Sequence, residues 1–187
     1  MQATAALLSL MALFASPSGQ NVLPNGGFEA GTIEPWTVAG GTWQVTDQQP
    51  HCGAFAATTT DGGILYQRFG PIRADEVVKI SFWIRATDPQ IDLDGPFAYY
   101  SLDMYDEQLG PLVGAVPIPA ISLDWQYWEI TPPAVSTHWL EGITIGSAGG
   151  RLLLDDVEVI SAVGAPEPAS LATLALGAIV LLRRRRR

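Results

Sequence analysis

The chain has 187 residues, enough for one domain with a substantial core, and a formal net charge of −9. It contains one cysteine, which excludes an intramolecular disulfide framework. Five of its ten basic residues are the arginines at 183–187, so residues 21–162 carry 18 acidic and five basic residues and a net charge near −13. That charge argues against binding to nucleic acid or to an anionic membrane surface.

An apolar run occupies the start of the chain, from Ala3 to Ala15, and small residues such as Ser18 and Gly19 follow it. This length and order predict a secretory signal peptide over residues 1–20, cleaved near Ser18 to Gln20. A transmembrane helix is the alternative, but the run is short for one.

Short apolar runs alternate with glycine- and proline-rich turns through residues 21–162, which predicts one all-β domain. Asp61-Gly62-Gly63 is a tight-turn signal between two of the expected strands. The number of strands exceeds that of a minimal immunoglobulin-like domain and favours a jelly-roll β-sandwich. The expected strands are 22–28, 37–45, 55–60, 64–69, 77–86, 97–105, 112–117, 125–131, 142–147 and 152–160.

Several aromatic residues fall on the outward side of these strands if the apolar side faces the core. In 77–86, Ile80, Phe82 and Ile84 form an apolar face. Sugar rings stack on exposed aromatics, and their hydroxyls pair with carboxylates and amides. We therefore expect an outward sugar-binding constellation, although large aromatics are usually core residues, as we expect for Trp36 and Trp43. Its members are Trp83, Tyr99, Asp103, Tyr127 and Glu129.

The last 25 residues, 163–187, have three successive parts: Pro166-Glu167-Pro168, the uncharged run Ala169–Leu182 and the arginines 183–187. This order resembles the PEP-CTERM sorting signal of Gram-negative bacteria. The resemblance implies recognition, and processing near Pro166, Glu167 and Pro168, by an exosortase-type membrane peptidase. By the positive-inside rule the arginines stay in the cytoplasm, so the domain lies outside.

The run 169–182 is short for a membrane span. We therefore expect a hydrophobic helix that tethers the chain to the inner membrane transiently. Release to the cell surface or the extracellular matrix would follow. The alternative is a C-terminal helix that packs on the domain, but the run has no polar face.

Two further segments, Asn25-Gly26-Gly27-Phe28-Glu29-Ala30-Gly31 and Leu152–Val159, resemble the opening and closing strands of the galactose-binding-like, carbohydrate-binding-module jelly roll. The resemblance implies that these two strands are neighbours. It also implies a structural Ca²⁺ near their ends, bound by carboxylates and backbone carbonyls. Carried over to this chain, the ligands are Glu29, Asp155 or Asp156, and the carbonyls near His51 to Gly53.

Strict alternation along 152–160 places Asp155 on the side of Val157, so we expect Asp155 to face inward and prefer it to Asp156 as a ligand. The alternative is two solvated carboxylates at a sheet edge. Asp92-Leu93-Asp94-Gly95 lacks the later ligands of an EF-hand, so we interpret it as a polar loop. For Cys52 we expect a small buried side chain rather than a reactive thiol.

No catalytic motif is recognisable, and the two histidines, His51 and His138, fall in different loops. We therefore predict a non-enzymatic exported protein whose β-sandwich binds extracellular polysaccharide and holds a structural Ca²⁺. The alternative is a structural protein of the extracellular polymer layer without a small ligand.

Overall fold

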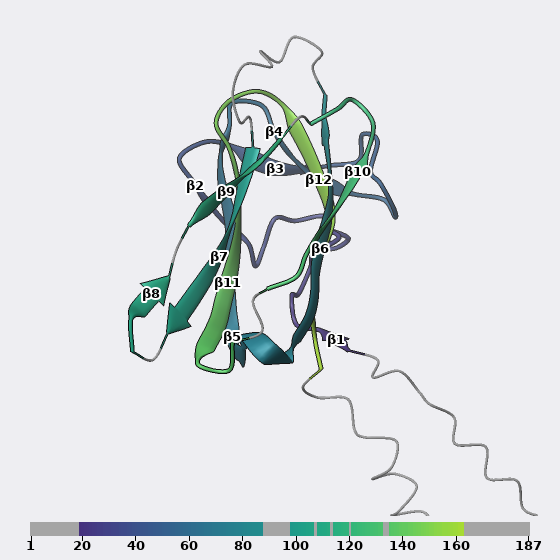
Figure 1. Ribbon diagram of the computed structural model, residues 1–187. Coiled ribbons are helices and arrows are strands. Elements are labelled where there is room, and N and C mark those ends of the chain that lie inside the picture. The colour runs from purple at the N-terminus through teal and green to yellow at the C-terminus, as the bar shows by residue number, and fades with distance from the viewer. Residues whose placement is uncertain are drawn as a thin grey trace, which may run out of the picture. The chain divides into compact units, whose positions relative to one another are not determined.

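The computed structural model describes residues 19–87, 98–106, 108–112, 114–119, 121–132 and 135–162. Within them it has twelve β-strands, one 3₁₀-helix and no α-helix (Figure 1). None of its helices there has the length and apolar character needed to cross a membrane. The elements are β1 Gln20–Asn21, β2 Thr37–Ala39, β3 Trp43–Thr46, β4 Ala56–Thr59, β5 Gly63–Arg73, η1 Ala74–Glu76, β6 Val77–Ala86, β7 Ala98–Asp106, β8 Gly110–Leu112, β9 Ala115–Ile118, β10 Gln126–Ile130, β11 His138–Ser147 and β12 Leu152–Ser161.

The strands form two sheets, and every strand pair is antiparallel. Sheet A has the order β10-β6-β12-β4-β3, with β1 added beside β12. Sheet B has the order β2-β5-β11-β7-β8, with β9 added beside β7. The two sheets lie on opposite sides of the domain in Figure 1. The predicted all-β sandwich is confirmed. The strand that pairs with β12 is β1, in which Gln20 pairs with Ser161, and not the predicted opening strand, although the Val157 N–H does donate to the Gly26 carbonyl at 3.0 Å.

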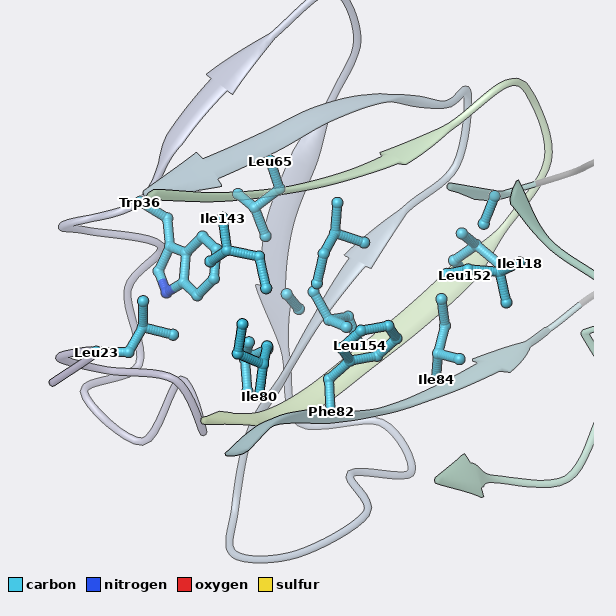
Figure 2. Close-up of a cluster of buried hydrophobic side chains, with 14 of the residues drawn as sticks. Leu23, Trp36, Leu65, Ile80, Phe82, Ile84, Ile118, Ile143, Leu152 and Leu154 are labelled. Carbon is cyan, nitrogen blue, oxygen red and sulfur yellow. The ribbon is translucent and has the colours of Figure 1, made fainter. Parts of the chain in front are cut away.

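The core fills the space between the two sheets (Figure 2). Sheet A contributes Ile80, Phe82 and Ile84 from β6, and sheet B contributes Ile143 and Ile145 from β11; all five are fully buried. These residues alternate along their strands with outward-facing ones, as the pleat requires. The outer face of each sheet is the side away from this core. It is formed by the side chains that alternate with the core residues along each strand. The predicted core tryptophans, Trp36 and Trp43, are buried.

Residues 22–28 are not a strand, contrary to the prediction. They form a series of turns in which Asn25 and Phe28 have positive φ angles of 53° and 57°. The Asn25 side chain holds the turn by donating to the carbonyls of Thr32 and Glu34 at 2.9 and 2.7 Å. Asparagine tolerates the left-handed region and bonds to nearby backbone, so local turn chemistry wins over apolar alternation here.

The expected strand 37–45 is two strands in different sheets. β2 lies in sheet B and β3 in sheet A, and the chain crosses between them at Gly40 and Gly41, whose φ angles are 62° and 152°. A side chain at Gly41 would overlap the backbone of Gly62, which lies in the turn where β4 leads into β5. The predicted turn at 61–63 is confirmed, and it carries the chain from β4 in sheet A to β5 in sheet B. This crossing therefore packs against the crossing at Gly40 and Gly41.

A β-bulge interrupts β12, so the side chains along 152–160 do not alternate strictly between the two faces, contrary to the prediction. The pairing with β6 shifts between Asp155 and Glu158, and Asp156 has a φ of 48°. As a result Leu154 and Val157 both belong to the core. Asp155 is on the outer side with Leu153, not on the core side with Val157. It is nevertheless fully buried, because the loop at residues 51–52 covers it.

Three predictions fall outside the described residues: the signal peptide over residues 1–20 except for its last two residues, the loop at 92–95, and the sorting signal with its helix at 169–182. The structure does not test these three predictions.

Candidate functional site

The five residues expected to form one sugar-binding surface lie on two different sheets. Trp83 belongs to β6, and Tyr127 and Glu129 belong to β10, all in sheet A. Tyr99 and Asp103 belong to β7 in sheet B. Since each points away from the core, the two groups lie on opposite outer faces and cannot contact one small ligand together. Sequence alternation identified outward residues but not which sheet each strand joins.

On the outer face of sheet B, Tyr99 lies across the neighbouring strand β11. Gly146 is its direct partner there, and a Cβ atom added to Gly146 would overlap the Tyr99 ring. The ring therefore covers the backbone of Gly146 and is partly exposed on its other side. Its strand neighbour Tyr100 packs against the core, which keeps Tyr99 outward.

A polar group lies further along the same face, around Gly142 of β11. Gly142 pairs with Arg68 of β5 on one side and with Asp103 of β7 on the other. A Cβ atom at Gly142 would lie 3.2 Å from Asp103 Oδ2 and 3.4 Å from Arg68 Cγ, so both side chains reach over this glycine. Thr144 lies between Gly142 and Gly146 along β11 and pairs with Tyr66. This outer face thus joins two tyrosines to a cation, a carboxylate and a hydroxyl.

We call this group the sheet B face; its residues are Tyr66, Arg68, Tyr99, Asp103, Gly142, Thr144 and Gly146. Of these residues, only Tyr99 and Asp103 were predicted from the sequence. A usable signal was present in Gly142-Ile143-Thr144-Ile145-Gly146, where isoleucines alternate with small residues. The isoleucines face the core, so the small residues leave space on the outer side.

On the outer face of sheet A, Trp83 does not offer an open ring face on the side of His51. The two rings stack with centroids 3.8 Å apart and planes 17° apart. Tyr127 lies 5.2 Å from Trp83 and is 44% exposed, and its hydroxyl donates to Glu129 Oε2 at 2.8 Å. The exposed aromatic of this group is therefore Tyr127.

The residues expected to bind Ca²⁺ do gather around the loop at 51–55. Asp155 Oδ2 accepts hydrogen bonds from the backbone N–H groups of His51 and Cys52, at 2.9 and 3.2 Å. Glu29 accepts from the N–H groups of Ala54 and Phe55, at 3.1 and 3.2 Å. Segments about 25 and 100 residues apart in sequence thus meet here, as the resemblance implied.

Gly53 is required by this arrangement. Its φ is +66°, a region that favours glycine, and a Cβ atom there would overlap the Glu29 carboxylate. Asp156 contacts the same loop through its Oδ2, which lies 2.8 Å from His51 Nδ1. The loop is therefore held by three carboxylates, and it turns four N–H groups toward two of them.

The chemistry of this cluster fits Ca²⁺ only in part. Among the described residues, no three His, Cys, Asp or Glu side chains are arranged to hold a metal ion. Burial raises the pKa of Asp155 from 3.8 to about 6, although backbone N–H donors from Cys52, Asp156 and His51 oppose the rise. A buried carboxylate without a cation partner is unfavourable, and Ca²⁺ would supply one.

Cys52 is exposed, contrary to the prediction of a buried side chain. The loop projects it to solvent because its backbone N–H is directed at Asp155. The second histidine, His138, lies elsewhere, with its Nε2 3.1 Å from Asp106 Oδ2.

Comparison with known proteins places these features in a family context. The chain matches a carbohydrate binding domain over residues 20–109 and the PEP-CTERM protein-sorting motif over residues 165–187, so both predicted resemblances are confirmed. No curated protein matches the sequence. Several solved carbohydrate-binding modules share the fold, at identities that show the fold alone.

One of these modules is TmCBM61, solved in complex with β-1,4-galactotriose, with 20% identity over 76% of this chain and 99% of that chain and a TM-score of 0.52. Another is the CBM22-1 xylan-binding domain of Paenibacillus barcinonensis Xyn10C, with 19% identity over 79% and 98% and a TM-score of 0.58. A third is family 16 carbohydrate binding module-2, with 11% identity over 75% and 100% and a TM-score of 0.60.

Proposed function

Because the chain combines a carbohydrate binding domain with a PEP-CTERM sorting motif, we propose that it is an exported protein that binds an extracellular polysaccharide on its sheet B face. The observation that carries the proposal is the position of the Tyr99 ring across Gly146. A ring laid along a sheet surface offers one π face to solvent, which is the surface that the C–H side of a sugar ring contacts.

The polar groups of the sheet B face support this assignment. Arg68, Asp103 and Thr144 provide donors and acceptors on the same outer face as the ring. Sugar hydroxyls act as donors and acceptors at once, so they pair with such mixed sets. A glycan chain lying along β11 would contact Tyr99 with one unit and the polar group around Gly142 with another.

The test is equilibrium binding of the full chain, in a mild detergent, to a panel of bacterial exopolysaccharides and plant polysaccharides. Tyr99→Ala is compared with Tyr127→Ala, which removes an exposed tyrosine from the opposite sheet. We expect Tyr99→Ala to weaken glycan binding up to about tenfold, because aromatic contacts contribute on the order of 0.5–1.5 kcal/mol, and Tyr127→Ala to leave that binding unchanged. Failure of the wild-type chain to bind any glycan would refute the proposal.

We also propose a structural Ca²⁺ held by Glu29 and Asp155, with carbonyls of the loop near His51 and Gly53 and with Asp156 as a further candidate. The support is the convergence of Glu29 and Asp155 on one loop and the burial of Asp155 without a cation among the described residues. The ion would join the N-terminal turns, the loop and β12, and its role would be stability rather than catalysis.

Sorting follows from the C-terminal motif. The PEP-CTERM match implies export and an exosortase partner. We propose that Pro166, Glu167 and Pro168 direct processing, and that the apolar run 169–182 tethers the chain in the inner membrane of a Gram-negative cell until then. Delivery to the surface or matrix places the domain among exopolysaccharides, including those of a biofilm.

We propose no catalytic role. The alternative is a structural protein of the extracellular polymer layer, in which the sandwich has no glycan ligand. That alternative predicts full retention in the layer by the Tyr99→Ala variant, whereas a glycan-binding protein would be released.

A further inference from the structure

A polar groove of about 670 Å³ crosses the outer face of sheet A, on the opposite side of the sandwich from the sheet B face. It runs over β3, β4 and β12 and reaches Gln48 and Gln49 after β3 and Thr87 after β6. Its volume lies within the range of ligand-binding clefts. Three glutamines and four threonines line it, with one arginine and one leucine: Gln44, Thr46, Gln48, Gln49, Thr58, Thr60, Thr87, Arg151 and Leu153.

The strand register explains why these side chains share one surface. Gln44 pairs with Thr58, and Thr58 pairs with Leu153, so the three form one row across β3, β4 and β12. Trp43 and Ala57, their neighbours along β3 and β4, belong to the core, which turns Gln44 and Thr58 outward. Leu153 is 3% exposed and forms the floor.

The charge of this groove differs from that of the domain. Among the described residues no carboxylate lines it, although residues 21–162 have a net charge near −13, and the one charged side chain among those lining residues is the exposed Arg151. Arg85 pairs with Leu153 on the side of β12 away from Thr58, so a second cation lies next to the floor.

These two arginines are also available to a ligand. Arg73 and Lys79 have carboxylate partners within 3.3 Å, whereas across the described residues Arg85 and Arg151 have no ion pair. The nearest carboxylates along β12, Asp155 and Asp156, are engaged by the loop at 51–52. Arg85 donates from Nε to the carbonyl of Ala86 at 3.4 Å, and its guanidinium lies 6.0 Å from the centroid of the Trp125 ring, so Arg151 is the more available of the two arginines.

We propose that this groove is a second binding site, separate from the sheet B face, for an acidic polysaccharide whose uronate carboxylate pairs with Arg151. Amides and hydroxyls can donate to and accept from sugar hydroxyls, and a guanidinium binds a carboxylate through two parallel hydrogen bonds. Because the described lining of the groove includes no carboxylate, a polyanion meets less repulsion there than the net charge of the domain would suggest. The site does not require that the sheet B face bind glycan.

The test uses a matched pair of probes, oligogalacturonate and its methyl ester, which differ in the charge of each uronate and in one methyl group on it. Binding to the full chain in mild detergent is measured by calorimetry at low and high salt. We expect the acid to bind more tightly than the ester, and the difference to shrink in high salt because the Debye length falls. Equal binding of the two probes would overturn the proposal.

Variants then locate the site. We expect Arg151→Gln to weaken binding of the acid about tenfold, since it removes a charge-assisted pair, and Gln44→Ala, an exposed substitution, to weaken it less. Arg73→Gln makes the same change in net charge at an arginine already paired with Asp75 and Glu76, and should leave binding as in the wild type. Tyr99→Ala should also keep it. Loss on Arg68→Gln with none on Arg151→Gln would instead place the anion on the sheet B face and refute the proposal.

Discussion

The ring of Tyr99 on β7 covers the backbone of Gly146 on β11, and it can do so only because residue 146 has no side chain. A substitution at the glycine therefore changes the tyrosine without removing it. A variant at Gly146 moves the Tyr99 ring, whereas a variant at Tyr99 removes it. The proposed glycan contact can therefore be tested at two residues.

Gly146→Ala should reduce glycan affinity about as much as Tyr99→Ala, up to about tenfold. The added Cβ would occupy the position of the ring, so the ring must rotate away from the sheet. Gly70→Ala is the matched control, because it also places a methyl group in a strand of sheet B but has no atom within 4 Å of the new Cβ. Binding is measured by affinity electrophoresis, and unchanged affinity in Gly146→Ala would contradict the role of Tyr99.

Calcium should raise the melting temperature of the chain if Glu29 and Asp155 hold the ion. At about 100 times the dissociation constant, binding contributes about 2.7 kcal/mol, which is roughly 5–10 °C for a domain of this size. Glu29→Ala should abolish that increase, whereas Asp124→Ala, an exposed carboxylate elsewhere, should keep it. Thermal unfolding with calcium and with chelator provides the measurement. If calcium leaves the melting temperature of the wild-type chain unchanged, the site is excluded.

Asp106 should make the free energy of unfolding depend on pH, because its stabilising contribution is lost in acid. Backbone N–H donors from Leu109 and Gln108 lower the pKa of Asp106 below 3.8. The unfolded chain then takes up this proton first, so the stabilising contribution is complete well above pH 3.8 and is lost as the pH falls through the folded-state pKa.

Asp106→Asn keeps an oxygen acceptor but removes the charge. We expect it to be less stable than the wild type at neutral pH and to approach the wild type as the pH drops below 3.8. Asp124→Asn serves as the control. Urea unfolding at a series of pH values provides the comparison, and a gap that stays constant with pH would be inconsistent with this role for Asp106.

Removal of residues 166–187 should leave export intact but abolish sorting. The truncated chain would be released into the medium rather than retained at the cell envelope, because it lacks both the processing motif and the apolar run. Glu167→Ala keeps the apolar run and the arginines, so it should accumulate unprocessed in the inner membrane. Fractionation and immunoblotting distinguish these outcomes; wild-type processing of Glu167→Ala would argue against the motif as the processing signal.

Local signals in the sequence located most of the strands correctly and failed where backbone geometry was special. Alternation placed Ile80, Phe82 and Ile84 in the core, and they are fully buried. It predicted a strand at 22–28, where Asn25 instead stabilises turns through its own side chain. It also predicted that Asp155 faces the core, which is wrong, because the bulge at Asp156 shifts the phase of β12. Alternation describes a regular strand and carries no information about such shifts.

The sequence by itself determined the all-β class, the acidic surface, the sorting motif and the residues that point outward, since these depend on composition and on the two-residue period of a strand. Only the tertiary structure decided which outward residues share a face. Tyr99 and Trp83 both point outward, yet they lie on opposite sheets because β7 pairs with β11 and β6 pairs with β12. Strand pairing joins residues far apart in the chain, and the rows of side chains that could meet a ligand exist only after it has formed.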